Sequence, residues 1–300
     1  MVEGTPQLSR LEKIAMAVGR LANENDRGKR AQWLYLRTLT KAIVATAARY
    51  RTYVEGIDWM VDFQPDRGVV QAANHRSFFD QYVAMLAYHT VGIPWARRMY
   101  FPVRSNFFYE SPLGLLVNLG IGAGTMYPPV FRDPAKSELT KEGVNRVISF
   151  LQRPGTFVGV HPEGTRGKGP DPYELLPAQP GIGQIVLQAR PIVIPLFING
   201  LPTSDVVTGV LDNFRPGIRR TNPIIIVFGR PVDYSDLTTS KPRAALYKKC
   251  SDRILDDIRK LGERERELRA ACVAGTIDDG DPGWLDNRAR TGRRNGKRHG

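Results

Sequence analysis

From about residue 54 onward, short apolar runs alternate with stretches of helical periodicity, and this alternation constrains the fold more than any other feature. The apolar runs predict strands at 57–63, 68–74, 98–103, 125–131, 155–160, 191–198 and 223–229. Helical periodicity covers 78–90, 111–119, 136–152, 181–189 and 241–269. Strands that alternate with helices favour a mixed, mostly parallel sheet with helices on its faces. The sequence therefore predicts an α/β fold.

Two amphipathic helices, predicted at 8–24 and about 29–50, precede this region. Basic helices with one apolar face either pack onto the body of a protein or lie on a membrane surface. At the other end, residues 286–300 contain no apolar residue larger than alanine and cannot fold alone. We therefore expect an N-terminal two-helix element at 1–53, a main domain at 54–270 and a basic, disordered tail at 271–300.

The formal net charge of +13 implies an anionic partner, which could be a lipid head group, a nucleic acid or an anionic cofactor. The two cysteines lie far apart and favour a reducing compartment over a disulfide framework. The uncharged stretch 111–131 is long enough to span a membrane, but its glycines and three prolines would break a lipid-exposed helix. We expect it to face a core or a membrane surface without spanning.

His75 lies where the predicted strand 68–74 gives way to the helix at 78–90. Two explanations of the neighbouring aspartate remain open on these residues alone. Ser77 and Asp80 form an S-x-x-D capping box, which would give Asp80 a purely structural role. Alternatively, Asp80 accepts a hydrogen bond from Nδ1 of His75 and leaves Nε2 free as a general base.

A second polar cluster follows the predicted strand 155–160, in the sequence HPEGTRG. Its turn presents a carboxylate (Glu163), a hydroxyl (Thr165) and a guanidinium (Arg166) together. The planar guanidinium suits an anionic head group, and Gly164 permits close approach of a ligand to the backbone. The alternative is a surface turn closed by a Glu163–Arg166 ion pair.

Together the two clusters resemble the signature motifs of the glycerolipid (lysophospholipid, or 1-acylglycerol-3-phosphate) acyltransferase superfamily. The N-H-x4-D block is Asn74, His75 and Asp80, and the P-E-G-T-R block is residues 162–166. A family strand that ends in arginine between the blocks is matched by YPPVFRD, which nominates Arg132. The later apolar strand is matched by PIVIPLFING. The resemblance covers about 54–232, and the two N-terminal helices suit the family's membrane-docking element.

The resemblance implies that an acyl group is transferred from a thioester, acyl-CoA or acyl carrier protein, to a hydroxyl of a lysophospholipid such as lysophosphatidic acid. His75 would be the general base and Asp80 would orient it, a form of catalysis that contributes about 10²–10⁴-fold. A covalent acyl-enzyme is not required, and the chain contains no G-x-S-x-G motif. The residues that would bind substrate are Asn74, Arg132, Glu163, Gly164, Thr165 and Arg166. No cofactor is implied beyond the acyl donor.

One segment departs from the family pattern. Many members carry a basic F-K-x-G segment after the glutamate block, whereas this chain reads LLPAQPGIG at 175–183. The missing basic residue leaves open an acceptor with a less anionic head group.

A metal site is the first rival interpretation, because His75, Asp80, His161 and Glu163 are suitable ligand types. H-x4-D is not a common zinc spacing, however, and Arg76 and Arg166 would place positive charge beside the ion. We therefore expect no metal. The sequence GIGAGT at 120–125 is similar to a dinucleotide-binding loop but lacks the third glycine and the following helix.

A non-enzymatic basic protein that binds lipid or nucleic acid is the second rival, and the net charge allows it. The chain shows no recognisable nucleic-acid motif, so we expect no specific nucleic-acid partner. The expected partners are the lysolipid acceptor, the acyl donor and an anionic membrane surface. The corresponding location is the cytoplasm, peripheral on the cytoplasmic face of the membrane.

Overall fold

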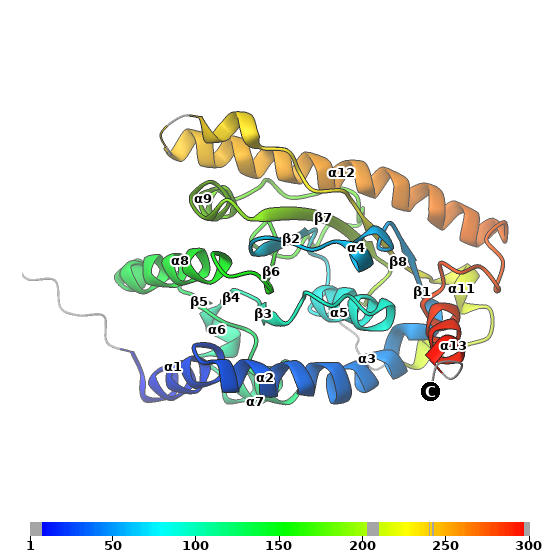
Figure 1. The fold of residues 1–300 in the computed structure, drawn as a ribbon, viewed down its shortest axis with the longest axis horizontal. Helices are drawn as coiled ribbons and strands as arrows, with labels where there is room; N and C mark the ends of the chain where they lie inside the picture. The colour runs from blue at the N-terminus through cyan, green and yellow to red at the C-terminus, as the bar shows by residue number, and fades with distance from the viewer. Residues whose placement is uncertain (1–7, 203–209, 240, 242, 297–300) are drawn as a thin grey trace, which may run out of the picture. The chain divides into compact units, whose positions relative to one another are not determined.

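The computed structural model describes residues 8–202, 210–239, 241 and 243–296 (Figure 1). Its contacts define two compact units that are interleaved along the chain. Unit one contains the described residues up to Thr40 together with 65–69 and 95–160, and unit two contains 41–64, 70–94 and the described residues from His161 onward. These units do not follow the expected boundary between segments 1–53 and 54–270. The division into an N-terminal helical element and a main domain therefore stays a prediction.

Unit two contains most of the strands. They are β1 (Thr52–Glu55), β2 (Val69–Ala73, with Val69 in unit one), β7 (Ile192–Asn199) and β8 (Ile224–Phe228), in the order β1-β8-β7-β2. β1 and β8 are parallel with Thr52 opposite Ile224, whereas β7 and β8 are antiparallel with Leu196 opposite Phe228. Every residue of β2 and β8 is buried, as expected for apolar strands that are covered on both faces.

The helices of unit two are α3 (Lys41–Ala48), α4 (Trp59–Asp62), α5 (Asp80–Val91), α9 (Pro180–Ala189), α11 (Ile218–Thr221), α12 (Ala244–Ala274) and α13 (Leu285–Gly296). The longest, α12, packs along α9, β7 and β8 (Figure 1). Gly183 makes the close approach of α9 to α12 possible, because a Cβ there would lie 1.9 Å from the carbonyl oxygen of Tyr247. A 3₁₀ turn at Arg49–Arg51 precedes β1, and another at Ser235–Thr238 follows β8.

Unit one contains α1 (Arg10–Asn23), α2 (Asp26–Tyr35), a π-helical turn (Leu36–Thr40), α6 (Ser105–Phe108), α7 (Pro112–Gly120), a 3₁₀ turn (Pro134–Lys136) and α8 (Ser137–Leu151). Its strands are β3 (Arg98–Tyr100), β4 (Val103–Arg104), β5 (Pro129–Val130) and β6 (Thr156–Val160). β3 pairs in parallel with β6, and β4 pairs in parallel with β5. The described strands thus confirm the predicted mixed, mostly parallel sheet flanked by helices.

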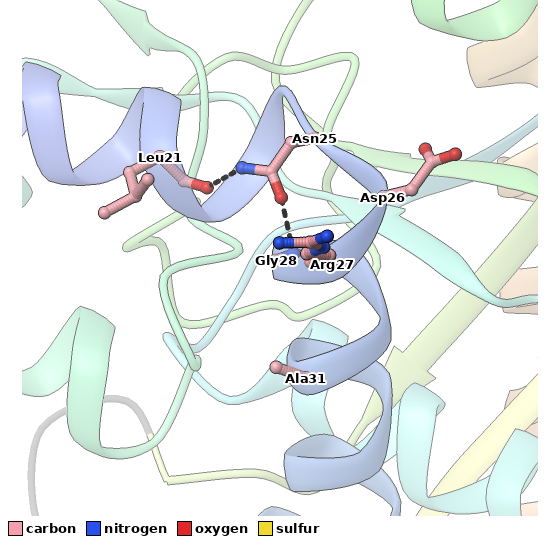
Figure 2. A pocket seen from close by; sticks show the side chains of 6 residues that line it. All are labelled: Leu21, Asn25, Asp26, Arg27, Gly28 and Ala31. Atoms are coloured by element: carbon pink, nitrogen blue, oxygen red, sulfur yellow. Dashed lines mark hydrogen bonds between the residues drawn. The ribbon is translucent and has the colours of Figure 1, made fainter.

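The N-terminal helices begin at side-chain caps. Ser9 and Glu12 form a reciprocal capping box on α1. Asn25 joins the two helices, because its amide donates to the carbonyl of Leu21 and its Oδ1 accepts from the Gly28 N–H at 2.7 Å (Figure 2). An open hollow of about 650 Å³ at this junction is lined by Leu21, Asn25, Asp26, Arg27, Gly28 and Ala31. Asp26 and Arg27 are the ionisable side chains of its lining, which has no histidine, cysteine or hydroxyl side chain.

Two predicted strands differ in the structure. The segment expected as a strand at 57–63 contains α4 instead, and the strand β1 precedes it. Gly56, at φ +76°, ends β1, and the buried Ile57 and Met60 then follow at helical spacing. The strand expected at 125–131 is reduced to β5, because consecutive prolines at 128 and 129 have no N–H to donate to a ladder.

The tail at 271–300 was expected to be disordered, but its described part contains a helix. α13 is helical, and Trp284 and Leu285 just before its polar stretch are fully buried. The Trp284 ring packs edge-on against Tyr53 at 5.2 Å, and its Nε1 donates to the Asp278 carbonyl at 2.9 Å. These two apolar residues anchor a segment whose own composition could not fold. Residues 297–300 lie outside the described residues.

No helix in the described part of the chain is long and apolar enough to cross a membrane.

Replacing Trp284 with alanine tests the anchoring of the C-terminal segment. Trp284 belongs to a buried cluster with Tyr53, Ile225, Val227, Leu268 and Cys272. Removing a buried aromatic side chain leaves a cavity, so we expect the free energy of unfolding in urea to fall by about 3–5 kcal/mol. Val273→Ala, at a side chain that is 60% exposed, is the control and should stay within about 0.5 kcal/mol of wild type. Equal stability of the two variants would contradict the anchoring.

Candidate active site

The end of β2 is fixed to the neighbouring strand β7 by Asn74. Its amide donates to the carbonyl of Ile198 at 2.9 Å and accepts from the N–H of Ile198 at 2.8 Å. Asn74 is fully buried. These bonds continue the pairing of the strands by one residue and determine where His75 leaves the sheet. The geometry thus supports a structural role for Asn74, and the predicted contact with substrate remains a prediction.

His75 and Asp80 lie together, as the second explanation of the N-H-x4-D block predicts. Nδ1 of His75 lies 3.0 Å from Oδ2 of Asp80. The same oxygen accepts the backbone N–H groups of Arg76 and Ser77, each at 2.9 Å. A carboxylate oxygen only accepts, so Nδ1 carries a proton and Nε2 of the neutral ring is left as an acceptor. The His75 side chain is 20% exposed, which gives a substrate access to it.

Only one of the two hydrogen bonds of the capping box predicted for Ser77 and Asp80 is present. Asp80 accepts the N–H of Ser77, but the hydroxyl of Ser77 donates to the carbonyl of Pro202 at 2.7 Å. α5 begins at Asp80, with Phe79 in the capping position. Asp80 therefore both binds backbone N–H groups at the start of α5 and contacts Nδ1 of His75, and its role in catalysis remains a prediction.

The carboxyl of Asp80 is in a strongly perturbed environment. Its side chain is 1% exposed, and Oδ1 has no hydrogen-bond partner among the described residues. Burial raises the pKa of Asp80 to about 6, although the N–H groups of Ser77 and Arg76 oppose that increase. A perturbed acid beside a histidine is typical of a functional site.

The turn that contains the P-E-G-T-R block holds the backbone of His75 on both sides. Oε1 of Glu163 accepts the N–H of His75 at 2.8 Å, and the N–H of Gly167 donates to the His75 carbonyl at 2.9 Å. Oε2 of Glu163 accepts the N–H of Leu176 at 2.8 Å. Glu163 is 2% exposed, and burial raises its pKa. Its geometry supports positioning of His75, and no Glu163–Arg166 ion pair is observed.

Three further residues predicted to bind substrate, Gly164, Thr165 and Arg166, follow Glu163 in this turn and are at least partly exposed. Gly164 has φ +64°, a left-handed conformation that favours glycine. Thr165 and Arg166 are half-buried. The guanidinium of Arg166 lies over the ring of Phe78, 3.9 Å from its centroid, in a cation–π contact. Phe78 is 45% exposed, so the pair presents a charged, planar surface to solvent.

Arg132 is an exposed residue of unit one, whereas all the other predicted site residues belong to unit two. Arg104 is its neighbour within unit one: burial, and then the charge of Arg132, lower the pKa of Arg104. The positive charge of Arg132 therefore acts on the guanidinium of Arg104 within unit one.

Sequence reasoning missed a stacked pair of histidines. The rings of His75 and His161 lie 3.8 Å apart between centroids, with their planes 12° from parallel. Nδ1 of His161 lies 2.9 Å from the carbonyl of Asn74 and 3.1 Å from that of Ala73. Burial, and then the proximity of His75, lower the pKa of His161 to about 3. The sequence did place both histidines directly after predicted strands, but it carried no sign that the two rings stack.

The donor atoms of His75, Asp80 and His161 lie within 4.8 Å of one another, so we tested whether they fit a metal ion. The lone pairs of an imidazole lie in the plane of its ring. Two nearly parallel, stacked rings therefore direct their lone pairs along separate planes rather than toward one ion. The oxygen Oδ2 of Asp80 already accepts three hydrogen bonds. The arrangement does not fit a metal ion, and it fits an acid–base pair.

A comparison with family models matches residues 53–199 to the family described as Acyltransferase. No curated protein sequence matches the chain. Among solved structures, the chain is similar to the 1-acyl-sn-glycerophosphate (LPA) acyltransferase PlsC from Thermotoga maritima, at 17% sequence identity and a TM-score of 0.48. That alignment covers 83% of this chain and 88% of the other. A likeness at this level assigns no function.

The pKa of Asp80 makes a prediction about stability. The folded carboxyl titrates at about 6, above the 3.8 of a free side chain, so the folded state holds this proton more tightly than the unfolded state. Ionised Asp80 therefore destabilises the fold. Wild type should lose about 2 kcal/mol relative to Asp80→Asn as the pH rises from about 4 to about 7. Urea unfolding of both proteins across this range measures it, and a difference that does not change with pH would contradict the shifted pKa.

Proposed function

Since residues 53–199 belong to the acyltransferase family, we propose that the protein transfers a fatty acyl group from an acyl thioester to a hydroxyl of a lysophospholipid. The donor would be acyl-CoA or an acyl carrier protein, and lysophosphatidic acid is the first acceptor to test. The observation that carries the proposal is the contact of His75 Nδ1 with the buried Asp80 carboxylate, which leaves Nε2 as a base.

The reaction follows from this arrangement. Nε2 of His75 takes the proton of the acceptor hydroxyl as its oxygen attacks the thioester carbonyl carbon. The C–S bond then breaks, and the imidazolium returns the proton to the departing thiolate. Asp80 stabilises the imidazolium that forms between these two steps. An ester and a free thiol are the products, with no redox change and no covalent intermediate on the protein.

Recognition of the acceptor would rely on arginine. Arg166 is held on Phe78 next to Gly167, which bonds to the His75 backbone, so its guanidinium lies on the turn that positions the base. Guanidinium groups bind phosphate through two parallel hydrogen bonds, and Arg132 would supply a second such group. The segment 175–183 adds no basic residue, which supports testing acceptors with less anionic head groups as well.

His75→Ala tests the proposed base. Activity with a labelled acyl-CoA and a panel of lysolipids should fall at least about 10²–10⁴-fold, because the variant has no group to accept the hydroxyl proton. Far-ultraviolet circular dichroism should be unchanged, since the His75 side chain is partly exposed rather than part of the core. His89→Ala, a histidine at the other end of α5, is the matched control and should retain activity. Full activity of His75→Ala would exclude the mechanism.

Peripheral attachment to the cytoplasmic face of a membrane is part of the proposal. In unit one, α1 exposes Ile14 (57%) and Leu21 (73%), α2 exposes Leu34 (58%), and α7 exposes Leu113 (62%) and Leu116 (67%). Exposed basic residues accompany them on α1 and α2: Arg10, Lys13, Arg20, Arg27 and Arg30. Exposed leucines beside basic side chains suit the boundary between acyl chains and anionic head groups.

The double substitution Ile14→Asp/Leu21→Asp tests this surface. It removes two apolar side chains and adds two negative charges, so binding to vesicles of phosphatidylcholine and phosphatidylserine should weaken by about 10²-fold or more. Val273→Asp places one charge at an exposed apolar residue of α12 and should leave vesicle binding unchanged. Co-sedimentation measures both, and undiminished binding of the double variant would rule out the α1 surface.

A further inference from the structure

A chain of buried polar side chains leads to the histidine pair within unit two. The Tyr88 hydroxyl donates to Oε1 of Gln71 at 2.5 Å, and Nε2 of Gln71 donates to Oε1 of Gln81 at 2.6 Å. Nε2 of Gln81 lies 3.3 Å from Nε2 of His161. Tyr88 and Gln71 are 1% or less exposed and Gln81 is 7% exposed, so these groups depend on one another for hydrogen bonds.

The hydrogen bonds of this chain run in one direction, which determines the state of His161. The amide oxygen of Gln81 already accepts from Gln71, so its amide nitrogen faces His161 and donates to Nε2. Nδ1 must then carry the proton, which it donates to the Asn74 carbonyl at 2.9 Å. His161 is held as one neutral tautomer, with both ring nitrogens engaged.

This fixed ring covers one face of the His75 imidazole. The centroids lie 3.8 Å apart and the planes are nearly parallel, so the His75 ring cannot tilt toward His161 without a clash. The hydrogen bond to Asp80 fixes the direction of Nδ1 within the plane of the ring, and a hydrogen bond along one direction resists rotation about its own axis only weakly. A stacked ring opposes that rotation. Together the two contacts determine the direction in which Nε2 points.

We propose that His161 is a positioning residue for His75: a neutral ring, locked by Gln81 and the Asn74 carbonyl, on which the general base is stacked. The proposal rests on the proposed acyl transfer. Because both nitrogens of His161 are engaged within the protein, His161 has no atom for the acceptor head group, and its removal should affect turnover rather than substrate binding. Misplacement of a reacting group by about 1 Å can cost about 10²-fold in rate.

The test compares His161→Ala with His161→Phe. Alanine removes the platform, so kcat should fall about 10–100-fold while KM stays within about 3-fold of wild type. Phenylalanine restores a flat ring of similar size, so kcat should return to within about 5-fold of wild type. Gln81→Leu keeps the ring but unlocks it, and it should lower kcat by about 3–10-fold. Gln188→Leu, at an exposed glutamine of α9, is the matched control and should have wild-type kinetics.

A second readout does not depend on activity. In protein with ¹⁵N-labelled histidine, the His75 Nδ1–H signal should be observed in wild type and in His161→Phe, and should be lost to exchange in His161→Ala. This measurement separates the two proposals, because it tests positioning even if wild type transfers no acyl group. It also applies to Gln81→Leu, where partial loss of the signal is expected, so the test survives if His161→Ala does not fold.

Three outcomes would overturn the proposal. The first is wild-type kcat with an intact Nδ1–H signal in His161→Ala. The second is an increase in KM at unchanged kcat, which would make His161 a substrate-binding residue. The third is a folded His161→Phe variant as impaired as His161→Ala, which would show that a stacked ring is not what His75 needs.

Discussion

The site depends on the two hydrogen bonds that hold the backbone of His75. Its N–H donates to Glu163 and its carbonyl accepts from Gly167, so the turn after β6 determines where the imidazole lies. Glu163 also accepts the N–H of Leu176, which connects a third segment to the same carboxylate. A charged acceptor forms stronger hydrogen bonds than a neutral one. The glutamate of the second motif thus positions the histidine of the first, although the two are far apart in sequence.

The burial of the Asp80 carboxylate lowers the stability of the fold but favours its interaction with His75. A carboxylate at 1% exposure destabilises the fold, and three donors on one of its oxygens offset only part of that cost. The same burial keeps water from weakening its interaction with His75. Natural active sites commonly carry a destabilising group of this kind, because the group is retained for its function although it lowers the stability of the fold. Neutral His161 fits the same logic, because a second positive ring at 3.8 Å would oppose the imidazolium that forms on His75.

The two units differ in character. Unit two contains His75, Asp80 and the turn at 162–167, and its core includes the C-terminal residues Trp284 and Leu285. Unit one contains Arg132 and the helices whose leucines are exposed. Several large apolar side chains exposed on the helices of one unit fit the proposed membrane surface. In the proposed function, unit two carries out proton transfer, and unit one supplies lipid attachment and one anion-binding residue.

The sequence by itself determined the class of fold and most helices and strands, and it placed His75 and Asp80 within reach of each other while leaving two explanations of the aspartate open. Each depends on residues close together in the chain, whose periodicity and spacing are properties of local backbone geometry. Tertiary structure alone decided that Glu163 holds the His75 backbone, that Gln71 and Gln81 lock His161, and that Trp284 anchors an otherwise polar tail. These contacts join residues far apart in sequence, and no local pattern encodes them because burial and hydrogen-bond partners exist only once the chain has packed.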